Sequence, residues 1–175
     1  MATVARTDET FATANGVSLC WQAFGEESAE PLVLIMGLGA QMVMWEDPFC
    51  EQLAARGFRV IRFDNRDIGR SQKMTGGERV TFADLIGLSL AGKPIPAVYT
   101  LKDMAADTVG LLDALGIARA HIVGLSMGGA IAQEIALGWP DRVKTLTSIM
   151  ASPGGAGLPP PTPEAAEAMF NSLFF

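Results

Sequence analysis

The stretch HIVGLSMGGA, residues 121–130, determines how the rest of this chain is interpreted. It begins with an apolar run typical of a strand, and a helix-like run follows it. Between them lies Gly124-Leu125-Ser126-Met127-Gly128, a Gly-x-Ser-x-Gly spacing. Glycines at these positions leave room for a tight turn from strand to helix, which lifts the serine hydroxyl above the sheet. The stretch predicts a nucleophile at Ser126, and the alternative is a helix N-terminus that this serine only caps.

On both sides of this turn, apolar strand-like runs alternate with segments of helical spacing. Before them, two alternating runs flank Asn15-Gly16, a strong signal for a two-residue hairpin. The alternation predicts an α/β fold with a mostly parallel sheet and an antiparallel hairpin at its start. The expected strands are 31–37, 58–64, 119–124 and 142–150, and the expected helices are 48–57, 100–116 and 127–140.

Composition excludes several classes of function. The net charge is −6, and the basic residues are scattered, so we expect neither a nucleic-acid partner nor an anionic membrane surface. No apolar run approaches the roughly 20 residues that a membrane-spanning helix requires. Cys20 and Cys50 lie in apolar surroundings without metal-ligand spacing, so we expect buried free thiols, no metal site and a cytoplasmic protein.

Three motifs resemble the α/β-hydrolase superfamily: GLSMGG (124–129), LVLIMGLG (32–39) and RFDNRDIGRS (62–71). They look most similar to its ester-cleaving members of the type that includes the aclacinomycin methylesterases. The resemblance implies the α/β-hydrolase fold, an acyl-enzyme on Ser126 and no cofactor. It also implies an oxyanion hole formed by the backbone N–H groups of Leu38 and Met127, which any side chain permits. Met36 stands where this family commonly has histidine before the glycine.

Residues near this loop are candidates for pocket lining: Gly37, Met42 and Trp45. For the Met and Trp side chains, an ordinary place in the core is the alternative. The loop 64–71 could form the rim of the pocket. It could also be a self-paired loop in which Asp64 and Asp67 pair with Arg66 or Arg70, and this is the interpretation that we favour.

A serine nucleophile needs a base, and the chain has a single histidine, His121. His121 and Ser126 lie on one expected strand, so about 16 Å separates them and His121 is expected to be structural. The family's order of catalytic residues is serine, acid, histidine. The later acidic residues, Glu134, Asp141, Glu164 and Glu167, do not directly follow the expected strand 142–150.

The base and acid are therefore expected in a missing or separate carboxy-terminal piece, with a second polypeptide as one source. Residues 1–155 are expected to form the amino-terminal part of the hydrolase core. Residues 156–175 would be a linker and the start of a cap helix, with Thr162 as N-cap and Pro163 as first helical residue.

The leading hypothesis is a serine hydrolase that cleaves a small-molecule carboxylic ester but is inactive as this chain alone. One alternative is a non-catalytic α/β fragment that serves as a binding or assembly module. Others are a thioesterase, a carbon–carbon hydrolase or a perhydrolase of the same fold.

Overall fold

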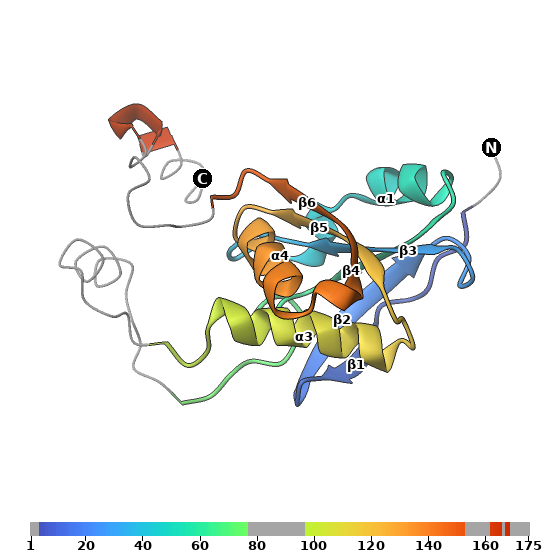
Figure 1. Cartoon of the computed structure of the whole chain (residues 1–175), viewed down its shortest axis with the longest axis horizontal. Helices are drawn as coiled ribbons and strands as arrows, with labels where there is room; N and C mark the ends of the chain where they lie inside the picture. Colours follow the sequence, from blue (N-terminus) through green and yellow to red (C-terminus); the bar gives the residue numbers. More distant parts are fainter. Residues whose placement is uncertain (1–3, 77–96, 153–161, 166, 169–175) are drawn as a thin grey trace.

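The described sheet has six strands in the order β1-β2-β4-β3-β5-β6. A computed structural model describes residues 4–76, 97–152, 162–165 and 167–168 (Figure 1). β1 pairs antiparallel with β2, and β2 pairs antiparallel with β4, whereas β3 runs parallel to both β4 and β5, and β5 runs parallel to β6. The expected α/β architecture is confirmed. The strands are β1 (Thr10–Ala14), β2 (Val17–Phe24), β3 (Glu30–Ile35), β4 (Phe58–Phe63), β5 (Ala120–Leu125) and β6 (Val143–Ile149).

The turn between β1 and β2 is the hairpin that the Asn-Gly pair predicts. Asn15 and Gly16 both have positive φ, 50° and 76°. Positive φ at both central residues is the requirement of a type I′ turn, whose twist matches that of the strands. The antiparallel start of the sheet is therefore determined by two adjacent residues.

Helices cover both faces of the sheet (Figure 1). α1 (Asp47–Ala54) lies on one face, where Cys50 packs with Leu34 and Val60. α3 (Leu101–Ala114) and α4 (Met127–Gly138) lie on the other face and bury the larger apolar core. Thr100 and Asp103 form a capping box at the start of α3. Two short 3₁₀ helices, η1 (Met42–Met44) and η2 (Pro140–Arg142), join these elements.

Two stretches that interrupt the alternation of strands and helices in the sequence, 77–99 and 151–163, are described only in part. Most of the stretch 77–99 lies outside the described residues. Residues 163–165 are helical, and Thr162 Oγ1 accepts a hydrogen bond from the Ala165 N–H at 3.2 Å, as expected of an N-cap. The division of the chain at residue 155 stays a prediction.

β6 is an edge strand, with β5 as its neighbour among the described strands. Nearly all of its residues are exposed, including Leu146 and Ile149. Such an open edge with apolar side chains is a site at which further chain can pair.

Candidate active site

Ser126 lies on a strained turn at the carboxyl end of β5. Its φ is 56° and its ψ is −121°, a conformation that non-glycine residues rarely adopt. The residue is exposed, and its side chain forms no cap hydrogen bond with α4. The structure therefore does not support the capping alternative. The geometry presents the hydroxyl to solvent above the carboxyl ends of the parallel strands.

The glycines beside Ser126 are required by close packing. A Cβ atom on Gly124 would lie 2.1 Å from the carbonyl oxygen of Gly128. A Cβ atom on Gly128 would lie 2.2 Å from the carbonyl oxygen of Ile35 at the end of β3. Both contacts are with backbone atoms, which cannot rotate away, so no side chain fits at either position. The elbow is thus packed directly onto the neighbouring strand.

The loop after β3 approaches this elbow. A Cβ atom placed on Gly37 would lie 3.2 Å from the Cβ of Ser126 and 3.7 Å from its Oγ. Leu38 follows directly, and its side chain is exposed. Met127 is the first residue of α4, so its N–H has no partner within the helix. Both predicted oxyanion donors therefore belong to segments that adjoin Ser126, and their role as an oxyanion hole stays a prediction.

A pocket of about 230 Å³ opens beside these two residues. Three other segments complete its walls: the loop after β4, the residue that precedes the cap of α3, and the first turn of α3. Its lining residues are Leu38, Gly39, Arg66, Ile68, Tyr99, Thr100, Leu101, Met104 and Met127. The pocket is thus an apolar cleft with few polar groups, as small-molecule sites usually are.

The residues that the sequence suggested as pocket lining lie elsewhere. Gly37 lies near Ser126 but is not among the described residues that line the pocket. Met42 is fully buried in the core, with its N–H donating to Asp64 Oδ1 at 2.8 Å. Trp45 is also buried and stacks on Phe49 with ring centroids 5.6 Å apart. The core alternative therefore holds for the Met and Trp side chains.

The favoured interpretation of the loop 64–71 was wrong. Its arginines do not pair with its own aspartates: Arg66 pairs with Asp107 on α3, and Arg70 pairs with Glu9. Asp64 instead accepts from the backbone N–H of Arg70 at 2.8 Å. The aspartates accept from other donors: Asp64 from the N–H groups of Met42 and Arg70, and Asp67 from the Met74 N–H and the Tyr99 hydroxyl. The loop also lines the pocket, which is the rim interpretation.

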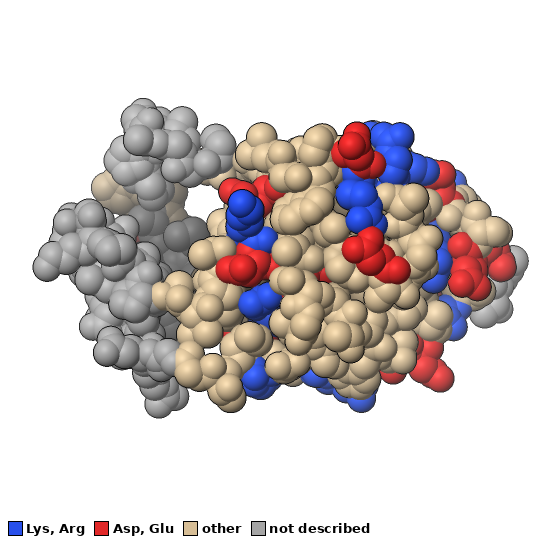
Figure 2. All heavy atoms as spheres, turned by 60° about the horizontal axis from the view of Figure 1, so that its bottom comes forward, with Lys and Arg blue, Asp and Glu red and all other residues tan. Residues whose placement is uncertain are grey.

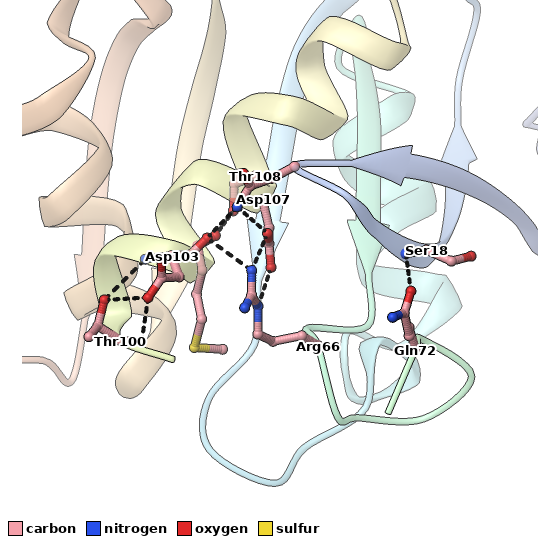
Figure 3. Close-up of polar contacts among 9 residues, drawn as sticks. Ser18, Arg66, Gln72, Thr100, Asp103, Asp107 and Thr108 are labelled. Carbon is pink, nitrogen blue, oxygen red and sulfur yellow. Dashed lines mark hydrogen bonds and ion pairs between the residues drawn. The ribbon is translucent and has the colours of Figure 1, made fainter. Parts of the chain in front are cut away.

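The ion pair between Arg66 and Asp107 is the part of the site that the sequence did not predict. Figure 3 shows Arg66 reaching from its loop to Asp107 on α3. Nε and Nη2 of Arg66 donate to the two carboxylate oxygens, each at 2.6 Å, and both side chains are buried. This hydrogen-bonded pair raises the pKa of Arg66. The pair joins two residues 41 positions apart, and no local sequence pattern predicts it.

Tyr99 adds a second polar group to the pocket wall. The Arg66 guanidinium lies 4.9 Å from the centre of its ring. Burial, together with a hydrogen bond to Asp67, raises the pKa of Tyr99 to about 12. The hydroxyl is therefore neutral at all physiological pH values.

His121 lies at the amino end of β5, away from Ser126 at the other end. Its Nδ1 lies 2.7 Å from Thr145 Oγ1, and its Nε2 lies 3.3 Å from Glu30 Oε1. Its ring also packs edge-on against Phe58. Both ring nitrogens therefore serve contacts between neighbouring strands, as expected of a structural histidine.

The described residues contain no group of three or more His, Cys, Asp or Glu side chains that could hold a metal ion. Their helices include none long and apolar enough to cross a membrane. On the face shown in Figure 2, acidic and basic side chains are interspersed rather than gathered by sign. The cytoplasmic location stays a prediction.

Comparison with known proteins agrees with this geometry. A family described as having the alpha/beta hydrolase fold matches residues 30–174. The chain belongs to the α/β-hydrolase family. A curated member, rhodomycin D methylesterase DauP from Streptomyces sp. strain C5, is 36% identical over 144 residues, which are 82% of this chain and 41% of DauP.

Solved α/β-hydrolase structures give the same result. The enol-lactonase from Burkholderia xenovorans LB400 is 30% identical with a TM-score of 0.66, and the match covers 82% of this chain and 47% of the lactonase. A hydrolase from Pseudomonas aeruginosa PA01 is also 30% identical with a TM-score of 0.66, over 96% of this chain and 54% of its own. The chain spans about half the length of the relatives that it matches. The expected partial coverage of the fold is thereby confirmed.

Proposed function

We propose that this chain is the nucleophile-bearing part of a serine hydrolase that cleaves carboxylic esters. The observation that carries the proposal is the exposed Ser126 at φ 56°, held against the Gly37–Leu38 loop beside an apolar pocket. The relatives named methylesterase and enol-lactonase support an ester or a lactone as substrate. We therefore propose an ester or a lactone as the substrate of the whole enzyme.

The chemistry follows from the site. Ser126 Oγ attacks the ester carbonyl carbon while a base takes its proton. The N–H groups of Leu38 and Met127 donate to the oxygen that becomes negative, and stabilisation by such donors is commonly worth about 3 kcal/mol each. Collapse breaks the bond to the alcohol, which leaves with the proton from the base. Water then attacks the acyl-enzyme in the same way and restores Ser126.

The base and acid would come from polypeptide outside these 175 residues. The only histidine is occupied at the opposite end of β5, and the chain spans 41% of the related methylesterase. β6 supplies an open edge for additional strands. A later part of the same protein or a second polypeptide could supply them, and intact mass of the purified protein distinguishes the two.

The test is hydrolysis by the protein together with its carboxy-terminal portion. We expect turnover of p-nitrophenyl esters that is lost in Ser126→Ala, whereas Ser148→Ala keeps it. Faster turnover of matched thioesters would favour the thioesterase alternative. Absence of any turnover by the folded protein would favour the non-catalytic binding module.

A further inference from the structure

Among the described residues that line the 230 Å³ pocket, Arg66 is the only charged one. Most of the other lining side chains are apolar, including Leu38, Ile68, Leu101 and Met104. A cation is an unfavourable neighbour for a purely hydrocarbon ligand, because apolar groups cannot compensate its lost hydration. The Arg66 guanidinium in the pocket wall therefore favours a ligand that carries a polar group.

One nitrogen of this guanidinium has no hydrogen-bond partner among the described residues. Nε and Nη2 donate to Asp107, and Nη2 also lies 3.5 Å from the Asp103 carbonyl oxygen. Nη1 donates to no described residue, although it carries two N–H groups. Arg66 is also one of the residues that line the pocket.

The guanidinium is held rigidly in this orientation. Its two bonds to Asp107 form a fork that prevents rotation of the planar group. Asn15 Nδ2 donates to the same carboxylate at 3.0 Å, and the guanidinium carbon lies over the Tyr99 ring, 4.9 Å from its centre. A donor fixed before binding loses little entropy when a ligand arrives.

The charges select the kind of acceptor. Asp107 neutralises Arg66, so the pair has no net charge to offset the burial of a second carboxylate. A neutral carbonyl oxygen loses less hydration than a carboxylate and still accepts from a charged donor. We propose that Arg66 is a specificity residue that donates from Nη1 to a neutral carbonyl oxygen on the apolar group that fills this pocket. The proposal rests on the proposed function for its biological meaning and identifies the substrate class as carbonyl-bearing apolar esters.

Three small probes of nearly equal shape test the proposal without catalysis: acetophenone, α-methylstyrene and benzoate. They present a neutral carbonyl, a methylene group and a carboxylate, respectively. The measurement is an NMR titration of the chain, followed at the amides of Leu38 and Met127 and at the Arg66 Nε–H. We expect acetophenone to bind roughly tenfold more tightly than α-methylstyrene, because a charged donor is satisfied. We expect benzoate to bind no more tightly than acetophenone.

The variant Arg66→Lys keeps a cation beside Asp107 but removes the Nη1 donor. We expect it to lose the preference for acetophenone while its affinity for α-methylstyrene is unchanged. If this variant does not fold, the wild-type protein alone tests the proposal. Tighter binding of acetophenone than of α-methylstyrene, with a shift of the Arg66 Nε–H resonance on binding, would then support it. Equal binding of the two neutral probes, tighter binding of benzoate, or no binding of any probe at these resonances would overturn the proposal.

The variant Ser126→Ala separates this proposal from the proposed function. It should show the same probe preference as wild type, because Ser126 does not line the pocket. If the wild-type protein shows the probe preference but its Ser126 never reacts, the proposed function is contradicted and the proposal about Arg66 is not.

Discussion

Ser126 is held in place by hydrogen bonds of its own backbone and by the close packing of the glycines beside it. Its backbone N–H donates to the Ile149 carbonyl oxygen at 2.8 Å, and its carbonyl oxygen accepts from the Gly129 N–H at 2.8 Å. The strained φ persists because the surrounding backbone leaves no alternative. At the residue scale, the site therefore depends on the contacts of glycines more than on the serine.

Gly128 gives the sharpest residue-scale prediction. Gly128→Ala would force a Cβ to within 2.2 Å of the Ile35 carbonyl oxygen, so the elbow or β3 must shift. We expect a loss of about 3 kcal/mol or more in the free energy of unfolding, beyond ordinary overpacking. Gly138→Ala, at the end of the same helix with nothing within 4 Å, is the control and should be neutral or stabilising by up to about 1 kcal/mol. Equal unfolding midpoints in urea for the two variants would refute the packing argument.

Tyr99 is the only tyrosine, so its titration can be followed by absorbance alone. We expect a phenol pKa of about 12 in the folded chain, against 10.0 ordinarily. Because the folded pKa is the higher one, the neutral phenol stabilises the fold fully below pH 10, and this stabilisation disappears as the pH rises through 12. Circular dichroism at each pH confirms that the chain is still folded. A midpoint near 10 in folded protein would show that Tyr99 is not held as described.

At the scale of elements, the Arg66–Asp107 pair joins α3 to the loop after β4, and residues of both segments line the pocket. Both partners are buried, which makes the loss of one costly. The capping box at the start of α3 orders the adjacent turn, with Thr100 N–H donating to Asp103 Oδ2 at 2.7 Å. The ion pair and the capping box therefore both stabilise the N-terminal part of α3.

Removal of one partner of this pair should destabilise the chain strongly. We expect Asp107→Leu to lower the free energy of unfolding by about 3–5 kcal/mol, because it leaves a buried guanidinium without its anion. The double variant Arg66→Met with Asp107→Leu should recover most of that loss. Urea unfolding followed by tryptophan fluorescence measures both. A double variant as unstable as Asp107→Leu alone would contradict a role for the pair itself.

Elements that depend on neighbouring residues were predictable from the sequence. The Asn15-Gly16 turn, the cap of α3 and the Ser126 turn each rest on a few adjacent positions. The ion-pair partners of the loop 64–71 were not predictable. Asp107 lies far along the chain from Arg66, and nearer aspartates were equally plausible partners. The positions of Met42 and Trp45 depend on which side of the loop after β3 faces the core, which composition does not reveal.

At the scale of the whole molecule, the direction of the parallel strands separates the two ends of the sheet. Ser126 and the pocket lie at the carboxyl ends, whereas His121 lies at the amino ends with Glu30 and Thr145. The sequence was sufficient for this conclusion, since strand direction and residue spacing alone exclude contact. What the sequence could not show is which segments close the pocket.

The open edge at β6 predicts self-association of the isolated chain. Leu146 on that strand is 40% exposed. Leu146→Lys should delay the onset of light scattering in concentrated samples, because a charge on an edge strand opposes further pairing. Leu137→Lys, on the exposed face of α4, is the matched control and should delay it less, although Leu137 is 79% exposed. An equal delay in both would point to general solubility rather than to the edge.

The most direct measurement is the site and rate of fluorophosphonate labelling of the folded chain, with and without added imidazole, read by tandem mass spectrometry. We expect slow labelling confined to Ser126, clearly faster when imidazole acts as an external base, and unchanged in His121→Gln. Labelling should vanish in Ser126→Ala. Labelling spread over other exposed serines, or lost in His121→Gln, would contradict the account.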